Sequence, residues 1–165
     1  MKLLIVLGVV LALPILFGLS SPSSASGTSA PMPEGLRRPV PGRITSGFGF
    51  RLAPDRPGSE YHTGVDIAAP SGQPVLAAAA GTVLFAGAAG NYGGLVILAH
   101  RGADGRIETW YGHLSVIHVR RGDQVPAGHV IGRVGSTGRS TGPHLHYEIR
   151  AGGRPVDPQR VYRAR

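Results

Sequence analysis

From Gly42 onward the chain consists of short apolar runs separated by turns that contain glycine, proline, asparagine or aspartate. The runs are partly β-branched, and no stretch after Leu19 keeps an apolar helical period for three turns. This pattern predicts a mostly β protein: a small antiparallel β-sheet domain, arranged as a sandwich or a partly closed barrel. The runs are Val75–Ala77, Gly81–Phe85, Leu95–Leu98, Val116–Val119, Val130–Val134 and Leu145–Ile149.

The amino terminus has the features of an export signal. Met1 and Lys2 precede an uncharged apolar run from Leu3 to Leu19, and small residues follow it. We expect a signal peptide over residues 1–25, and hence a secreted, extracytoplasmic protein. The alternative is an uncleaved membrane anchor, which is the one membrane contact that we expect. Residues 26–41, rich in Ser, Pro and Gly, are predicted to be a linker, and residues 42–165 a single domain.

Two residue types are almost absent, and their absence excludes several classes of protein. The chain has no cysteine, which rules out disulfide scaffolds, cysteine nucleophiles and cysteine-ligated metals. Its single lysine is Lys2, which rules out a lipoyl or biotin carrier with a lysine at a hairpin tip. The formal charge is +8, but no nucleic-acid-binding motif accompanies it, so we expect no nucleic-acid partner.

Two of the seven histidines are spaced to converge on one point. His144 and His146 lie in a predicted strand, where side chains two residues apart project from the same face. His62 and Asp66 would add an imidazole and a carboxylate. Each pattern has a simpler interpretation, a half-buried strand histidine or a turn in which Asp66 bonds its own backbone. Their combination in one small domain favours a catalytic Zn²⁺ site with three protein ligands and one open position.

Hydrolysis at such a site also needs a group that moves protons, and histidine suits that role near neutral pH. The candidates are His113, in the segment Tyr111–Ser115, and one of the His144/His146 pair, which spacing alone does not separate. Of the other histidines, His100 is predicted to be structural, and His118 and His129 are predicted to be surface or core-packing residues rather than ligands. Trp110 with Tyr111, and the turn Asn91–Gly94, are candidates for the edge of a substrate groove, with core packing an equal alternative for Trp110.

These segments together resemble the lysostaphin/LytM-type zinc endopeptidases of bacterial cell walls, a family with a duplicated-hybrid-motif-like β domain. The resemblance runs from about Arg43 to Pro158 and covers many separate motifs. They include residues 44–51 (ITSGFGFR), 62–67 (HTGVDI), 111–115 (YGHLS), 141–146 (TGPHLH) and 155–158 (PVDP).

The resemblance implies a groove over a zinc ion held by His62, Asp66 and His146. It implies that His144 is the general base and that His113 is a second catalytic histidine that helps to stabilise the transition state. The implied reaction is hydrolysis of a peptide bond in peptidoglycan stem peptides or cross-bridges, by a protein that we expect to be a monomer in the cell wall or periplasm. The alternative is a catalytically weak peptidoglycan-binding or amidase-regulating module on the same fold. All five positions are present, which favours activity.

Overall fold

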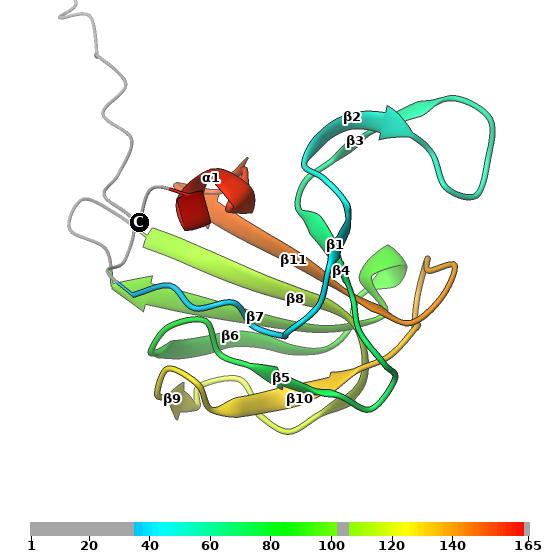
Figure 1. The fold of residues 1–165 in the computed structure, drawn as a ribbon. Helices are drawn as coiled ribbons and strands as arrows, with labels where there is room; N and C mark the ends of the chain where they lie inside the picture. The colour runs from blue at the N-terminus through cyan, green and yellow to red at the C-terminus, as the bar shows by residue number, and fades with distance from the viewer. Residues whose placement is uncertain (1–34, 102–105, 164–165) are drawn as a thin grey trace, which may run out of the picture.

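The computed structural model describes residues 35–101 and 106–163, and these form the predicted mostly β fold with antiparallel strand pairing (Figure 1). The strands are β1 (Ile44–Ser46), β2 (Gly49–Leu52), β3 (Ser59–His62), β4 (Val65–Ala68), β5 (Pro74–Leu76), β6 (Gly81–Ala88), β7 (Gly94–Arg101), β8 (Arg106–Ile117), β9 (Gln124–Val125), β10 (Val130–Val134), β11 (His144–Ala151) and β12 (Arg154–Val156). A 3-10 turn, η1 (Gly90–Tyr92), and a helix, α1 (Pro158–Arg163), accompany them.

The main sheet follows the order β1–β4–β11–β8–β7–β6–β9, with β12 paired to β11. β8 pairs with β7 and β11 over most of its length, and its last residues pair with β10 instead. β10 pairs in turn with β5, and these two strands lie beneath the main sheet (Figure 1). The sheet therefore folds over on itself without closing into a barrel.

The hydrophobic core combines residues from both layers. Val83, Leu98 and Tyr111 come from β6, β7 and β8, and Val75 and Ile131 come from β5 and β10; all five are fully or almost fully buried. Burial of such side chains is the dominant favourable term in folding. The core fixes one face of the main sheet and leaves the opposite face of β11 for polar side chains.

The β2–β3 hairpin is a separate two-stranded sheet that stands apart from the main sheet (Figure 1). One of its faces carries the exposed side chains of Phe50 and Leu52, with Tyr61 in edge-to-face contact with Phe50. Arg51 and Glu60 pair across the hairpin, and strand alternation places them on its other face. The hairpin therefore has one face with exposed apolar side chains and one charged face.

The end of the predicted linker is packed against the domain. Leu36 is 1% exposed and Val40 is 0% exposed, and both belong to the core cluster. The Arg37 amide donates to the Ala78 carbonyl, and the Leu76 amide donates to the Pro39 carbonyl. The packed unit therefore includes residues 36–40. The predicted signal peptide, residues 1–25, and residues 26–34 lie outside the described residues.

The helix α1 was not predicted, although its start has a recognisable signal. The Asp157 carboxylate accepts a hydrogen bond from the Gln159 amide, and Pro158 occupies the first helical position. Within residues 35–101 and 106–163, no helix combines the length and the apolar character needed to cross a membrane.

Candidate metal centre

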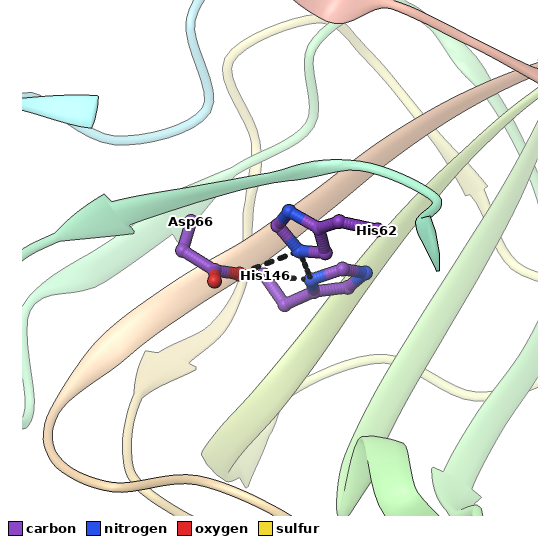
Figure 2. A group of neighbouring side chains, drawn as sticks. All are labelled: His62, Asp66 and His146. Carbon is purple, nitrogen blue, oxygen red and sulfur yellow. Dashed lines mark hydrogen bonds and ion pairs between the residues drawn. The ribbon is translucent and has the colours of Figure 1, made fainter. Parts of the chain in front are cut away.

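The three predicted metal ligands lie together although they belong to three different strands. His62 ends β3, Asp66 lies in β4, and His146 lies in β11 directly opposite Asp66. One ligand atom from each side chain lies within 4.8 Å of the other two, and all three residues are buried (Figure 2). The structure therefore brings together groups that are 80 and 84 residues apart in the sequence.

A glycine allows the turn between β3 and β4 to approach β11. A Cβ on Gly64 would overlap the backbone oxygen of Tyr147 and would crowd the side chain of Glu148. The absence of a side chain at this position lets the turn lie directly against β11. His62, two residues earlier, consequently reaches His146.

Each ligand histidine uses its outward nitrogen for a hydrogen bond. His62 Nδ1 donates to the Gly47 carbonyl at 2.7 Å, and His146 Nε2 donates to Glu148 Oε1 at 3.0 Å. A neutral imidazole carries one N–H, so the lone pairs of His62 Nε2 and His146 Nδ1 face inward. The structure thus distinguishes the ligand atoms, which residue spacing does not.

The inward-facing atoms form a donor set that suits a cation. His62 Nε2 and His146 Nδ1 lie 3.1 Å apart, and Asp66 Oδ1 lies 3.1 Å from the first and 2.9 Å from the second. Burial would raise the pKa of Asp66, but hydrogen bonds from His146 and His62 hold it below its usual range whenever an inward-facing nitrogen carries a proton, and a bound metal ion would take the place of that proton. Two imidazoles and an ionised carboxylate can thus share one metal ion, and this nitrogen and oxygen set fits zinc.

A β-bulge places His113 beside this group. Gly94 of β7 pairs with Leu114 and Val96 pairs with Tyr111, so two residues of β8, the second of them His113, lie opposite a single residue of β7. His113 has a φ of 63°, which is uncommon for a residue with a side chain. Bulges commonly re-aim a side chain beside a functional site, and His113 here lines the groove.

The two histidines predicted to be catalytic lie next to each other and are oriented alike. His113 Nδ1 donates to the Thr137 carbonyl at 2.8 Å, and His144 Nδ1 donates to the Gly142 carbonyl at 2.7 Å. The centroids of the His113 and His144 rings are 4.7 Å apart, and His144 Nε2 is 3.6 Å from Asp66 Oδ1. Burial lowers the pKa of His113 to about 4. Because Nδ1 of each ring donates to a carbonyl, the Nε2 atoms of His113 and His144 are the nitrogens left to accept a hydrogen bond beside the predicted ligands.

A groove of about 540 Å³ contains all five predicted site residues. Its walls come from the β2–β3 hairpin, from the loop between β10 and β11, and from η1. Asn91 and Tyr92 line it, as predicted for its edge, whereas Tyr111 is buried in the core. Trp110 packs behind Tyr92, 5.5 Å away, with the Arg150 guanidinium 3.9 Å above its ring.

Alternating charges connect a predicted ligand to the rim of the groove. Asp66 Oδ2 accepts from Arg51 at 2.8 Å, and Arg51 also pairs with Glu60 at 3.0 Å. Arg139, from the β10–β11 loop, pairs with Glu60 at 2.7 Å and with Asp55 of the hairpin. We call this set of five residues the charge chain. The sequence analysis did not predict that Arg51 and Arg139 belong to the site. For Arg51, the alternation along β2 and β3 that pairs it with Glu60 was a usable signal.

The sequence analysis also did not predict that Glu148 belongs to the site. It follows His146 by two residues on the same strand and therefore projects from the same face. That spacing was a usable signal once His146 was considered as a ligand.

The remaining histidines lie outside the metal centre, as predicted. His100 is buried, and its Nδ1 donates to the Ala80 carbonyl at 2.9 Å. Its Nε2 lies 2.7 Å from the Thr109 hydroxyl. His118 and His129 are on the surface.

A family model matches most of the described domain. The model of Peptidase family M23 matches residues 60–158. The chain belongs to peptidase family M23. The match extends from the end of the β2–β3 hairpin to the start of α1 and so includes all five predicted site residues.

Individual curated relatives are similar over most of the domain. The DD-carboxypeptidase/endopeptidase Mpg of Neisseria meningitidis is 52% identical over 119 residues, which cover 72% of this chain and 27% of the relative. This chain thus spans about a quarter of the length of the first curated relatives that it matches.

Solved peptidase structures share the fold. A zinc-containing peptidase from Vibrio cholerae has a TM-score of 0.66 and 37% identity, covering 72% of this chain and 37% of that one. The catalytic domain of the antimicrobial peptidase lysostaphin from Staphylococcus simulans has a TM-score of 0.65 and 34% identity, covering 73% of this chain and 92% of that one.

Proposed function

We propose that this protein is a zinc-dependent endopeptidase that hydrolyses peptide bonds in peptidoglycan stem peptides or cross-bridges. The observation that carries the proposal is the convergence of three ligand atoms with two further histidines, His113 and His144, on one open groove. Membership of the M23 family and the names of the relatives, among them a DD-carboxypeptidase/endopeptidase and lysostaphin, support the substrate class.

His62 Nε2, Asp66 Oδ1 and His146 Nδ1 would hold the metal. Zinc bound there would polarise the scissile carbonyl and lower the pKa of a water molecule toward about 7. With three protein ligands, a bound zinc ion would keep a coordination position for water or substrate. The carbonyl of Gly47 and the carboxylate of Glu148 keep the two imidazoles oriented for this role.

We assign His144 as the general base. Its Nδ1–H is tied to the Gly142 carbonyl, so Nε2 is available to accept a proton from the attacking water. The same nitrogen, once protonated, can deliver a proton to the leaving amine. Its distance of 3.6 Å from Asp66 Oδ1 places it beside the ligand group without making it a ligand.

We assign His113 as the second catalytic histidine. In its resting neutral form Nε2 accepts a hydrogen bond and can orient the attacking water. As negative charge develops on the substrate oxygen, the proton affinity of this nitrogen rises; a proton taken up from bulk water then lets His113 donate a hydrogen bond to that oxygen, and the proton returns to bulk water when the oxyanion collapses. Its link to the Thr137 carbonyl holds the ring in place during this exchange.

The proposal includes an extracytoplasmic location, with residues 1–25 as a signal peptide or, alternatively, as an anchor. The support is the apolar run from Leu3 to Leu19 followed by small residues. We further propose that the protein works as a monomer on peptidoglycan peptides, because the groove residues described above all come from one chain.

Hydrolysis of defined muropeptides by the chain from Ser26 onward tests this function. We expect cleavage that is lost with a chelator and restored by zinc. In His144→Ala, zinc should remain bound while turnover falls by at least a hundredfold; in His146→Ala, zinc should be lost. A folded, zinc-loaded wild-type protein that releases no fragment would favour the regulatory alternative. Loss of zinc from His144→Ala would show that the ligand assignment is wrong.

A further inference from the structure

A buried carboxylate behind the metal centre has four hydrogen-bond donors. Glu148, which is 0% exposed, accepts at Oε1 from His146 Nε2 at 3.0 Å, from the Thr63 hydroxyl at 2.6 Å and from the Tyr92 hydroxyl at 2.7 Å. Its Oε2 accepts from Arg150 Nε at 2.7 Å. A buried carboxylate is costly unless it is paired and hydrogen-bonded, and this one is both.

The four donors come from three parts of the fold. His146 and Arg150 lie on β11 with Glu148, Thr63 belongs to the β3–β4 turn, and Tyr92 ends η1. His62, the last residue of β3, immediately precedes Thr63. The η1 turn forms part of the groove wall. One carboxylate thus connects two ligand-bearing segments and one wall of the groove.

His146 differs from the other three histidines of the metal centre in the acceptor of the hydrogen bond that its N–H donates. His62, His113 and His144 each donate to a neutral backbone carbonyl, whereas His146 donates to a carboxylate. A charged acceptor makes the stronger hydrogen bond and increases the electron density on the opposite nitrogen. It also commits Nε2, so that Nδ1 is the nitrogen left to face Asp66.

We infer that Glu148 is a positioning residue that fixes His146 for metal binding through Nδ1. Through Thr63 and Tyr92, it holds the β3–β4 turn and the η1 wall in register with the metal centre. This inference rests on the metal centre of the proposed function, but it concerns metal affinity and ring orientation rather than hydrolysis. It adds to the five predicted site residues a sixth that touches neither metal nor substrate.

The test compares Glu148→Gln with Glu108→Gln in the full chain. Glu108 is a matched control: it is also buried, lies on the neighbouring strand opposite Arg150, and accepts a hydrogen bond from Trp110. Zinc affinity is measured by competition with a chromophoric chelator. We expect zinc binding to weaken about 10- to 100-fold in Glu148→Gln and to change less than about twofold in Glu108→Gln.

A spectroscopic measurement separates positioning from general damage to the fold. In ¹⁵N-histidine-labelled, zinc-loaded wild type, we expect the His146 signals of a ring ligated through Nδ1 and protonated at Nε2. In Glu148→Gln, the Nε2 signal should shift, whereas the signals of His100, which lies outside the centre, should stay in place. Unchanged affinity together with unchanged His146 signals would overturn the inference.

Two milder variants keep the test decisive if Glu148→Gln does not fold. Thr63→Val and Tyr92→Phe each remove one hydroxyl donor to Glu148 and keep the rest of the side chain. We expect each to weaken zinc binding about two- to fivefold; unchanged affinity in both would overturn the inference. Wild type that fails to hold zinc would overturn the metal centre itself, whereas wild type that holds zinc without hydrolysing muropeptides would contradict only the proposed activity.

Discussion

At the scale of single residues, the backbone of His113 has a strained conformation. This conformation directs the imidazole toward the groove. A φ of 63° is unfavourable for a residue with a Cβ, by about 1 kcal/mol or more relative to glycine. We therefore expect His113→Gly to be more stable than His113→Ala by about 1 kcal/mol, while both lose turnover. Urea denaturation of the two variants provides the measurement. Equal stabilities would mean that the bulge relaxes when the imidazole is removed.

His100 makes the stability of the fold depend on pH. Burial lowers the pKa of His100 from its ordinary value of 6.5, so the folded state favours the neutral ring. The stability that this preference gives is complete above about pH 6.5 and is lost as the pH falls below that value. We expect the drop in Tm between pH 8 and pH 5.5 to be smaller in His100→Gln than in wild type. The exposed His129 is the control, and His129→Gln should show the wild-type drop.

At the scale of elements, the β3–β4 turn depends on Gly64. A Cβ there would overlap the Tyr147 carbonyl oxygen, and backbone atoms of two paired segments have little freedom to move apart. We expect Gly64→Ala to lower the free energy of unfolding by about 2 kcal/mol or more and to weaken metal binding. Gly87→Ala is the control, because its Cβ would meet only the Phe85 ring at ordinary contact distance. Similar losses in both variants would contradict this account.

The charge chain joins two walls of the groove across its rim. Arg139 of the β10–β11 loop pairs with Asp55 and Glu60 of the hairpin, and its hydrogen bond lowers the pKa of Asp55 to about 2. Exposed ion pairs contribute little to global stability but can restrict local motion. We expect Arg139→Gln to leave Tm unchanged and to speed hydrogen exchange in residues 53–58 and 136–142.

Salt and a second arginine provide the controls for this prediction. Added salt should speed the same exchange in wild type and have less effect in Arg139→Gln, since exposed charge pairs are screened. Arg133→Gln should leave exchange in both loops unchanged, because Arg133 is exposed and donates to the Gly72 carbonyl away from the groove. Unchanged exchange in Arg139→Gln would show that the two walls are held by other contacts.

At the scale of the whole molecule, the segment before β1 is part of the core. Burying a leucine or valine side chain contributes about 1.5–3 kcal/mol, and Leu36 and Val40 are both buried. We expect a chain that begins at Gly42 to be about 3–6 kcal/mol less stable than one that begins at Ser26. Urea denaturation compares the two, and equal stabilities would show that this segment packs without contributing.

The sequence predicted runs that correspond to β5, β6, β7, β10 and β11, together with the five site residues, because both leave local signals. The predicted run Val116–Val119 overlaps only the end of β8, and β1–β4, β9 and β12 were not predicted. Period-2 spacing placed His144 and His146 on one face, and short β-branched runs between glycine turns indicated antiparallel strands. The mostly β prediction is confirmed, and the structure brings the five residues together; their individual roles stay predictions. Three features depend on contacts between distant segments and left no comparable signal: the bulge at His113, the pairing of Arg139 with the hairpin and the packing of Leu36.

Trp110 gives this arrangement an optical readout. It is the single tryptophan of the sequence, and it contacts Tyr92 and Arg150, which both bond to Glu148 behind His146. Any change in tryptophan emission on metal loading therefore originates from one known position, without an attached dye. The protein thus carries an intrinsic fluorophore two contacts away from its candidate metal centre, because Trp110 contacts Tyr92 and the Tyr92 ring lies 5.6 Å from the ring of His146.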